Sequence, residues 1–149
     1  MVKYPYIIEC EKRGLIMSEI GTYSIEVDTY RRLVTIKVRG TFDEAKASEF
    51  HADYLKTVYP LETNTYLLIL DSQGMDVIDR DMLPKLQVSF ALYRKSNFKE
   101  ICFIILNEQI RQQVLKLIRF SGIADISEVT YILPEELERK IERHVVNRP

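Results

Sequence analysis

The sequence predicts an α/β protein: a single domain with a mixed, mostly parallel β-sheet of about five strands, an N-terminal hairpin and about four helices. The run Tyr-Leu-Leu-Ile-Leu at residues 66–70 is apolar throughout, as in a central strand covered on both faces. Strand and helix patterns alternate from residue 34 onward, an order that right-handed crossovers fold into a largely parallel sheet. At 149 residues, the chain has the length of one domain.

Residues 1–20 are expected to form an N-terminal extension of uncertain structure, so that the domain spans residues 21–149. Pro5 is compatible with a short edge strand at residues 4–10. Alternatively, the native protein starts at Met17, because residues 11–14 can be encoded by purine-rich codons like those of a bacterial ribosome-binding site.

The first two predicted strands, residues 23–27 and 34–38, alternate cleanly between apolar and polar residues. The connection between them is short enough for a hairpin. Asp43 is a good N-cap for the helix that follows, and Pro60 ends that helix. The residues expected on its buried face are Ala47, Phe50, Tyr54 and Val58.

The elements expected after the central strand are a helix at residues 82–95, a strand at 101–106, a helix that stops at residues 120–122, a strand at 129–133 and a terminal helix opened by Pro134. Pro84 falls in the first turn of its helix, where a missing N–H costs least. Gly122 suits the left-handed position after a helix. In the terminal helix, Glu136 and Lys140 are spaced for an i,i+4 ion pair.

Composition points to an ordinary soluble globular protein in a reducing, cytoplasmic location. The content is 46% hydrophobic and 29% charged, and the formal charge of −1 gives no general attraction to nucleic acid or anionic membranes. No apolar stretch approaches the roughly 20 residues of a membrane span. We expect no secretory signal, because the first residues lack an apolar h-region and a small-residue cleavage site. Two distant cysteines make no disulfide framework, and Cys102, inside an apolar run, is expected to be a buried, inert thiol.

The sequence has no signature of an enzyme or of a cofactor-binding protein. Dinucleotide and phosphate-binding glycine motifs are missing, as is the nucleophile elbow of hydrolases. His51 and His144 each lie on a predicted helix beside charged residues, without a second ligand at metal spacing, and are expected to be surface histidines. We therefore predict no catalytic residues, no cofactor and no metal.

Aspartates crowd the connection after the central strand, at positions 71, 76, 79 and 81. Paired carboxylates there are compatible with a cation site, but acidic residues at strand ends and helix starts are the usual caps and turn formers. Asp71-Ser72-Gln73-Gly74 also has the composition of a local phosphoacceptor motif. Because Ser72 directly follows the apolar run, we expect it in the turn, with its hydroxyl bonded to local backbone.

Three segments, at residues 33–43, at 68–71 with 79–82, and at 114–123, together resemble the STAS domain family (sulfate transporter and anti-sigma-factor antagonist), in particular its stand-alone bacterial antagonists. Residues 33–43 are similar to the family's strand followed by G-x-[LF]-D. Residues 68–71 and then 79–82 parallel its strand-Asp followed by D-[ST]-[ST]-G at a helix start. Residues 114–123 resemble its helix closing in S-G-[LI]. The resemblance covers about residues 23–141 and implies the α/β fold that the pattern of elements also predicts.

In the antagonists that this sequence resembles, a serine at that helix start is phosphorylated by an anti-sigma-factor kinase, and the phosphate ends the interaction. Here Arg80, Asp81 and Met82 occupy the positions of the two hydroxyl residues and the glycine. Asp81 has no hydroxyl to phosphorylate. Its carboxylate is either a permanent phosphate-like charge, favoured by the helix dipole, or the N-cap of the helix.

The resemblance implies a non-enzymatic regulatory module that binds a protein partner, such as an anti-sigma factor or a kinase-like regulator. Its expected site consists of Asp79, Arg80, Asp81, Met82 and Lys85, with Asp43, Asp71 and Ser72 as secondary candidates. The alternative is a sensor of a small molecule or a nucleotide-like anion that uses the same edge between strand and helix. An enzyme using the aspartate cluster ranks last, because no base, nucleophile and oxyanion site converge.

Overall fold

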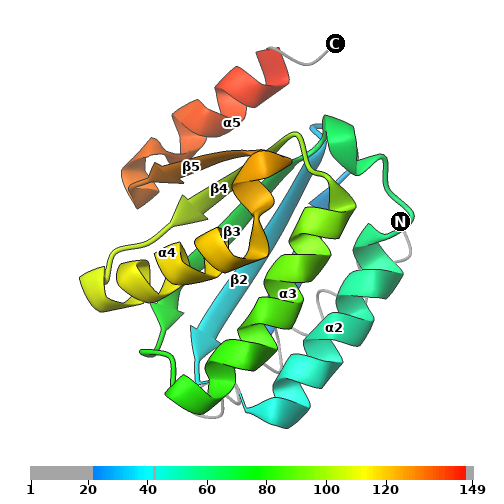
Figure 1. Cartoon of the computed structure of the whole chain (residues 1–149). Helices are drawn as coiled ribbons and strands as arrows, with labels where there is room; N and C mark the ends of the chain where they lie inside the picture. Colours follow the sequence, from blue (N-terminus) through cyan, green and yellow to red (C-terminus); the bar gives the residue numbers. More distant parts are fainter. Residues whose placement is uncertain (1–21, 42, 147–149) are drawn as a thin grey trace.

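The computed structural model describes residues 22–41 and 43–146 of the chain (Figure 1). The expectations for residues 1–20, including the start at Met17, lie outside the described residues. Elements are labelled as in Figure 1, and each is introduced with its bounds.

An antiparallel hairpin opens the described chain, as predicted. Its strands are β1 (Thr22–Asp28) and β2 (Leu33–Gly40), and Val27 pairs with Val34 beside the turn. The Asp28 carboxylate accepts the backbone N–H groups of Tyr30 and Arg31 in the turn, at 3.0 and 2.9 Å. Asp28 thus supplies the turn signal, through a side chain that mimics a backbone hydrogen bond.

The sheet has five strands in the order β1-β2-β3-β4-β5, and every pair after the hairpin is parallel. The mixed, mostly parallel sheet predicted from the sequence is therefore confirmed. The remaining strands are β3 (Leu67–Met75), β4 (Glu100–Ile104) and β5 (Glu128–Ile132). The helices are α2 (Glu44–Val58), α3 (Leu83–Ser96), α4 (Glu108–Ser121) and α5 (Leu137–Val146).

The sequence correctly predicted the start of α2 and the end of α4 from the residues at those helix ends. The Asp43 carboxylate accepts the backbone N–H of Lys46 at 2.8 Å, which makes Asp43 the N-cap of α2. Gly122 follows α4 with φ of 73°, the left-handed conformation that glycine adopts without strain. None of the described helices is both long enough and apolar enough to cross a membrane.

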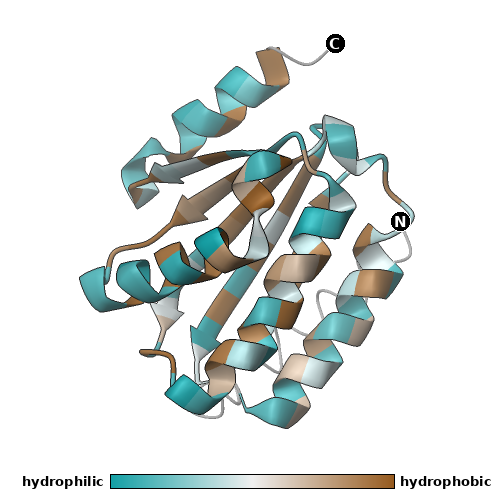
Figure 2. Cartoon of the chain, in the orientation of Figure 1, coloured by the Kyte–Doolittle hydropathy of each residue, from teal (hydrophilic) through white to brown (hydrophobic). Residues whose placement is uncertain are grey.

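Two hydrophobic clusters lie on opposite faces of the sheet. On one face Leu68 and Leu70 join a large cluster with residues of α2, α3 and α4. On the other, Leu67, Ile69 and Cys102 pack against α5. Figure 2 shows the hydrophobic residues along the strands and hydrophilic ones along the outward sides of α4 and α5. Both faces of β3 are covered, which is why its sequence is continuously apolar.

His144 lies in the interface between α5 and the hairpin. Its side chain is 5% exposed, and its Nε2 lies 2.9 Å from the carbonyl oxygen of Arg32. The prediction of a surface histidine is therefore wrong at this position, because α5 turns His144 toward the sheet. Burial lowers the pKa of His144, although the Arg32 carbonyl opposes that shift; Lys99 also lowers it, and Glu100 raises it.

We expect stability to fall as the pH is lowered from 7.5 to 5.5. Burial also lowers the pKa of His51, with a further contribution from Lys85. In the unfolded chain both histidines titrate near the ordinary pKa of about 6.5, so the unfolded state takes up protons first as the pH falls. Urea unfolding at both pH values measures the effect. The variant His51→Gln/His144→Gln should lose most of this pH dependence, and an unchanged slope would contradict the assignment.

Candidate functional site

Strand β3 continues five residues beyond the apolar run, through Asp71-Ser72-Gln73-Gly74 to Met75. It does so because β2 offers a parallel partner as far as Gly40, which pairs with Met75. The Ser72 hydroxyl donates to the carbonyl oxygen of Ile104 on β4 at 3.3 Å. The expectation that Ser72 lies in a turn and bonds local backbone is therefore wrong. Its polar neighbours are tolerated in the strand because they are only partly buried or exposed.

The connection from β3 to α3 begins at Asp76 and passes through a short 3-10 turn, Arg80–Met82, before the helix starts at Leu83. Neither this turn nor α3 has a side-chain cap at its start. The interpretation of Asp81 as the N-cap is therefore wrong. Pro84 lies in the first turn of α3, as predicted, where its fixed backbone angle suits the helix.

A glutamine on α4 holds this connection in place. Ile78, which is buried, donates its backbone N–H to Oε1 of Gln113 at 3.0 Å. Gln113 Nε2 donates in return to the carbonyl oxygen of Ile78 at 2.7 Å. One side chain thus satisfies both backbone groups of the same residue, so the position of Asp79 and the start of α3 depend on α4.

Gln113→Ala is expected to cost about 1–2 kcal/mol of stability, because it leaves a buried N–H and carbonyl without their partners. The neighbouring Gln112→Ala is a matched control, since Gln112 is exposed and bonds Glu108 within the same helix at 2.9 Å. Amide hydrogen exchange at Ile78 should accelerate in the first variant and not in the control. Equal exchange in both would show that the Gln113 contacts do not hold the connection.

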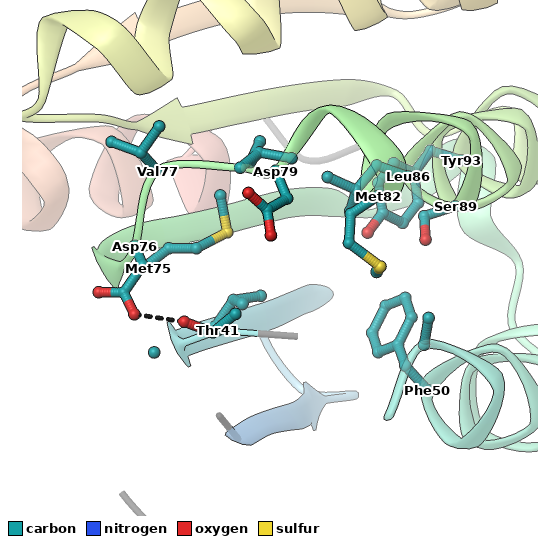
Figure 3. A pocket seen from close by; sticks show the side chains of 14 residues that line it. Thr41, Phe50, Met75, Asp76, Val77, Asp79, Met82, Leu86, Ser89 and Tyr93 are labelled. Atoms are coloured by element: carbon teal, nitrogen blue, oxygen red, sulfur yellow. Dashed lines mark hydrogen bonds between the residues drawn. The ribbon is translucent and has the colours of Figure 1, made fainter. Parts of the chain in front are cut away.

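A pocket opens between this connection, the ends of β2 and β3, and the facing sides of α2 and α3 (Figure 3). It encloses about 60 Å³. The side chains and backbone that line it are those of Val38, Gly40, Thr41, Ala47, Phe50, Met75, Asp76, Val77, Ile78, Asp79, Met82, Leu86, Ser89 and Tyr93. The pocket lies at the carboxyl ends of two parallel strands, where open α/β sheets commonly bind ligands.

The structure separates the predicted site residues into three groups. Asp79 and Met82 line the pocket. Arg80 and Asp81 are exposed beside it, and within residues 22–41 and 43–146 neither side chain forms an ion pair or hydrogen bond. Lys85 forms an ion pair with Glu44 at 3.3 Å and so connects the first turns of α3 and α2.

The three secondary candidates do not join the pocket. Asp43 is occupied as the cap of α2. Asp71 accepts hydrogen bonds from the backbone N–H and the side chain of Gln73, at 3.1 and 3.0 Å, and Ser72 bonds β4. In the described part of the chain, no three His, Cys, Asp or Glu side chains come together as a metal site would require.

Sequence reasoning missed Ser89 and its partner. Ser89 is 4% exposed and lines the pocket, and its Oγ lies 2.8 Å from Nε2 of His51 on α2. The surface prediction for His51 is accordingly wrong in part, because its ring is half-buried against α3. The helical spacing could have indicated that Ser89 is buried, because it places Ser89 among Leu86, Phe90 and Tyr93 on the inward side of α3. A polar residue in such a stripe needs a buried partner.

Comparisons with known proteins identify the fold. No protein-family model matches the sequence, and no curated protein matches it. An anti-sigma factor antagonist from Mycobacterium paratuberculosis superposes with a TM-score of 0.50 at 12% identity, over 83% of this chain and 96% of that one. An uncharacterized DUF3478-family protein with a SpoIIAA-like fold, from Shewanella loihica, gives a TM-score of 0.58 at 12% identity, over 81% and 92% of the two chains. The chain thus has an α/β domain with the SpoIIAA-like fold.

Proposed function

We propose that the chain is a non-enzymatic, cytoplasmic regulatory module that binds a protein partner through the surface at the start of α3. We call this the docking surface and define it by Asp79, Arg80, Asp81, Met82 and Lys85. One of the similar structures is an anti-sigma factor antagonist, so an anti-sigma factor or a kinase-like regulator is the class of partner we infer.

The observation that carries the proposal is the pair Arg80 and Asp81. Both side chains are exposed, adjacent and unpaired among the described residues, while Lys85 close by has a partner. Unpaired charges of opposite sign suit recognition, because they favour one orientation of a complementary partner. The exposed Val77 and Val88, on either side along the chain, supply apolar area of the kind found within interfaces.

We do not expect regulation by phosphorylation at the position where similar antagonists carry their phosphoacceptor serine. Asp81 stands where the resemblance places the phosphoacceptor serine, and a carboxylate cannot accept phosphate from a serine kinase. Ser72 is half-buried, and its hydroxyl is engaged with Ile104. We therefore infer a module whose docking surface is permanently charged rather than switched by phosphorylation.

Site-specific photocrosslinking in cells tests the proposal. A photoreactive residue would replace Asp81 in one variant, Lys85 in a second and Arg139 in a third. Arg139 is exposed on α5, which packs on the other face of the sheet, and serves as the control. We expect positions 81 and 85 to trap the same protein and position 139 not to trap it. The same product from all three positions, or none from 81 and 85, would contradict the proposal.

A further inference from the structure

The pocket beside Asp79 is large enough for part of a small organic molecule. By the usual measure, one water needs about 10–15 Å³, and a cavity of about 150 Å³ takes a benzene ring. The 60 Å³ found here therefore holds several atoms of a chain but not a full ring. Because the pocket opens to solvent, a ligand can place its remaining atoms at the mouth.

The interior wall of the pocket is mostly apolar. Phe50, Leu86 and Tyr93 surround it together with the thioether chains of Met75 and Met82 (Figure 3). Methionine side chains are unbranched and adapt to ligands of differing shape. Ser89 contributes a hydroxyl, which is already paired with His51. An alkyl group is therefore the part of a ligand that this wall accepts.

The charges that line the pocket are all negative. Asp76 and Asp79 are the charged residues of the lining, and it contains no lysine or arginine. Asp76 accepts a hydrogen bond from the Thr41 hydroxyl at 2.5 Å. The Asp79 carboxylate has no partner among the described residues, and Figure 3 shows its side chain pointing into the pocket. These carboxylates oppose an anionic or nucleotide-like ligand at this position.

We propose that this pocket is a binding site for a small alkylamine, with the alkyl chain inside and the ammonium group at the Asp79 carboxylate. Asp76, which also lines the pocket and is exposed, adds negative potential at the mouth. The site does not depend on a protein partner, so it can be tested on the purified full chain. Failure of this site therefore leaves the docking proposal untouched.

The test compares three ligands of similar size and different charge: n-butylamine, 1-butanol and butanoate. Each is titrated into isotope-labelled protein, and amide shifts at Met82 and Ser89 are followed into the millimolar range, where ligands of this size bind. We expect the amine to bind about threefold more tightly than the alcohol, as a solvent-exposed charge pair allows, and butanoate to bind most weakly. The amine's advantage should shrink at about 0.5 M salt, where exposed charges are screened.

Asp79→Asn is the decisive variant, because an exposed residue can be replaced without loss of folding. It should bind the amine and the alcohol equally while its affinity for the alcohol stays unchanged. Glu138→Gln on α5, an exposed carboxylate removed elsewhere, should keep the preference for the amine. The proposal is overturned if the amine shifts no pocket amides, if butanoate binds as tightly as the amine, or if the preference survives in Asp79→Asn.

Discussion

Exchanging the two unpaired charges, by Arg80→Asp together with Asp81→Arg, is expected to weaken partner binding by about 2–3 kcal/mol, a roughly 30- to 150-fold loss of affinity. The exchange keeps the net charge and the residue types but places like charges opposite each other in the complex. Neither side chain has a partner among the described residues, so the free energy of unfolding should change by less than about 0.5 kcal/mol. Affinity would be measured against the crosslinked partner after its purification.

The matched control exchanges a similar pair on α5, by Glu138→Arg together with Arg139→Glu. Both residues are exposed, and α5 packs on the face of the sheet opposite α3. This variant should bind the partner as the wild type does. Loss of binding in both variants would mean that association does not depend specifically on the docking surface.

Lys140→Met is expected to lower the free energy of unfolding by about 2–3 kcal/mol, because it leaves the mostly buried Glu100 carboxylate without its cationic partner. Lys140 Nζ is paired with Glu100 Oε2, and their side chains are 17% and 13% exposed. Glu100 also accepts a hydrogen bond from the Thr130 hydroxyl at 2.7 Å. The ion pair joins α5 to β4, and the Thr130 hydrogen bond extends the connection to β5. Loss of the pair should therefore weaken the packing of α5 on its face of the sheet. Urea denaturation measures the change.

Two further variants show whether the ion pair carries the effect. Glu100→Gln in the Lys140→Met background removes the unpaired negative charge and should recover part of the lost stability. Arg139→Met changes the adjacent, exposed residue and should have little effect. If Lys140→Met and Arg139→Met behaved alike, the contact with Glu100 would not be holding α5.

Local signals predicted most of the fold. The apolar run within β3, the Asp43 cap and the Gly122 helix end each act over a few residues, and all three are present in the structure. Contacts between distant parts of the chain were not predictable in this way. Lys140 was expected to pair with Glu136 in its own helix, but Glu136 instead accepts the backbone N–H of Leu133 at 2.7 Å.

The candidate site shows the same difference between local signals, which the sequence reveals, and contacts between distant residues, which it does not. The sequence placed Asp79, Arg80 and Asp81 between a strand and the start of a helix, and the structure has them between β3 and α3. The burial of His144 depends on a carbonyl group 112 residues away. The clamp from Gln113 to Ile78 spans 35 residues. No short-range pattern encodes such contacts, because they form only once the sheet is assembled.

The docking surface is tested most directly by hydrogen–deuterium exchange of the whole chain with and without its purified partner. We predict that protection on binding is concentrated in residues 76–90, which include the connection from β3 and the first turns of α3. Residues 128–146, which form β5 and α5, should exchange at the same rate in both states. Protection confined to residues 128–146, with none in residues 76–90, would contradict the assignment of the docking surface to the start of α3.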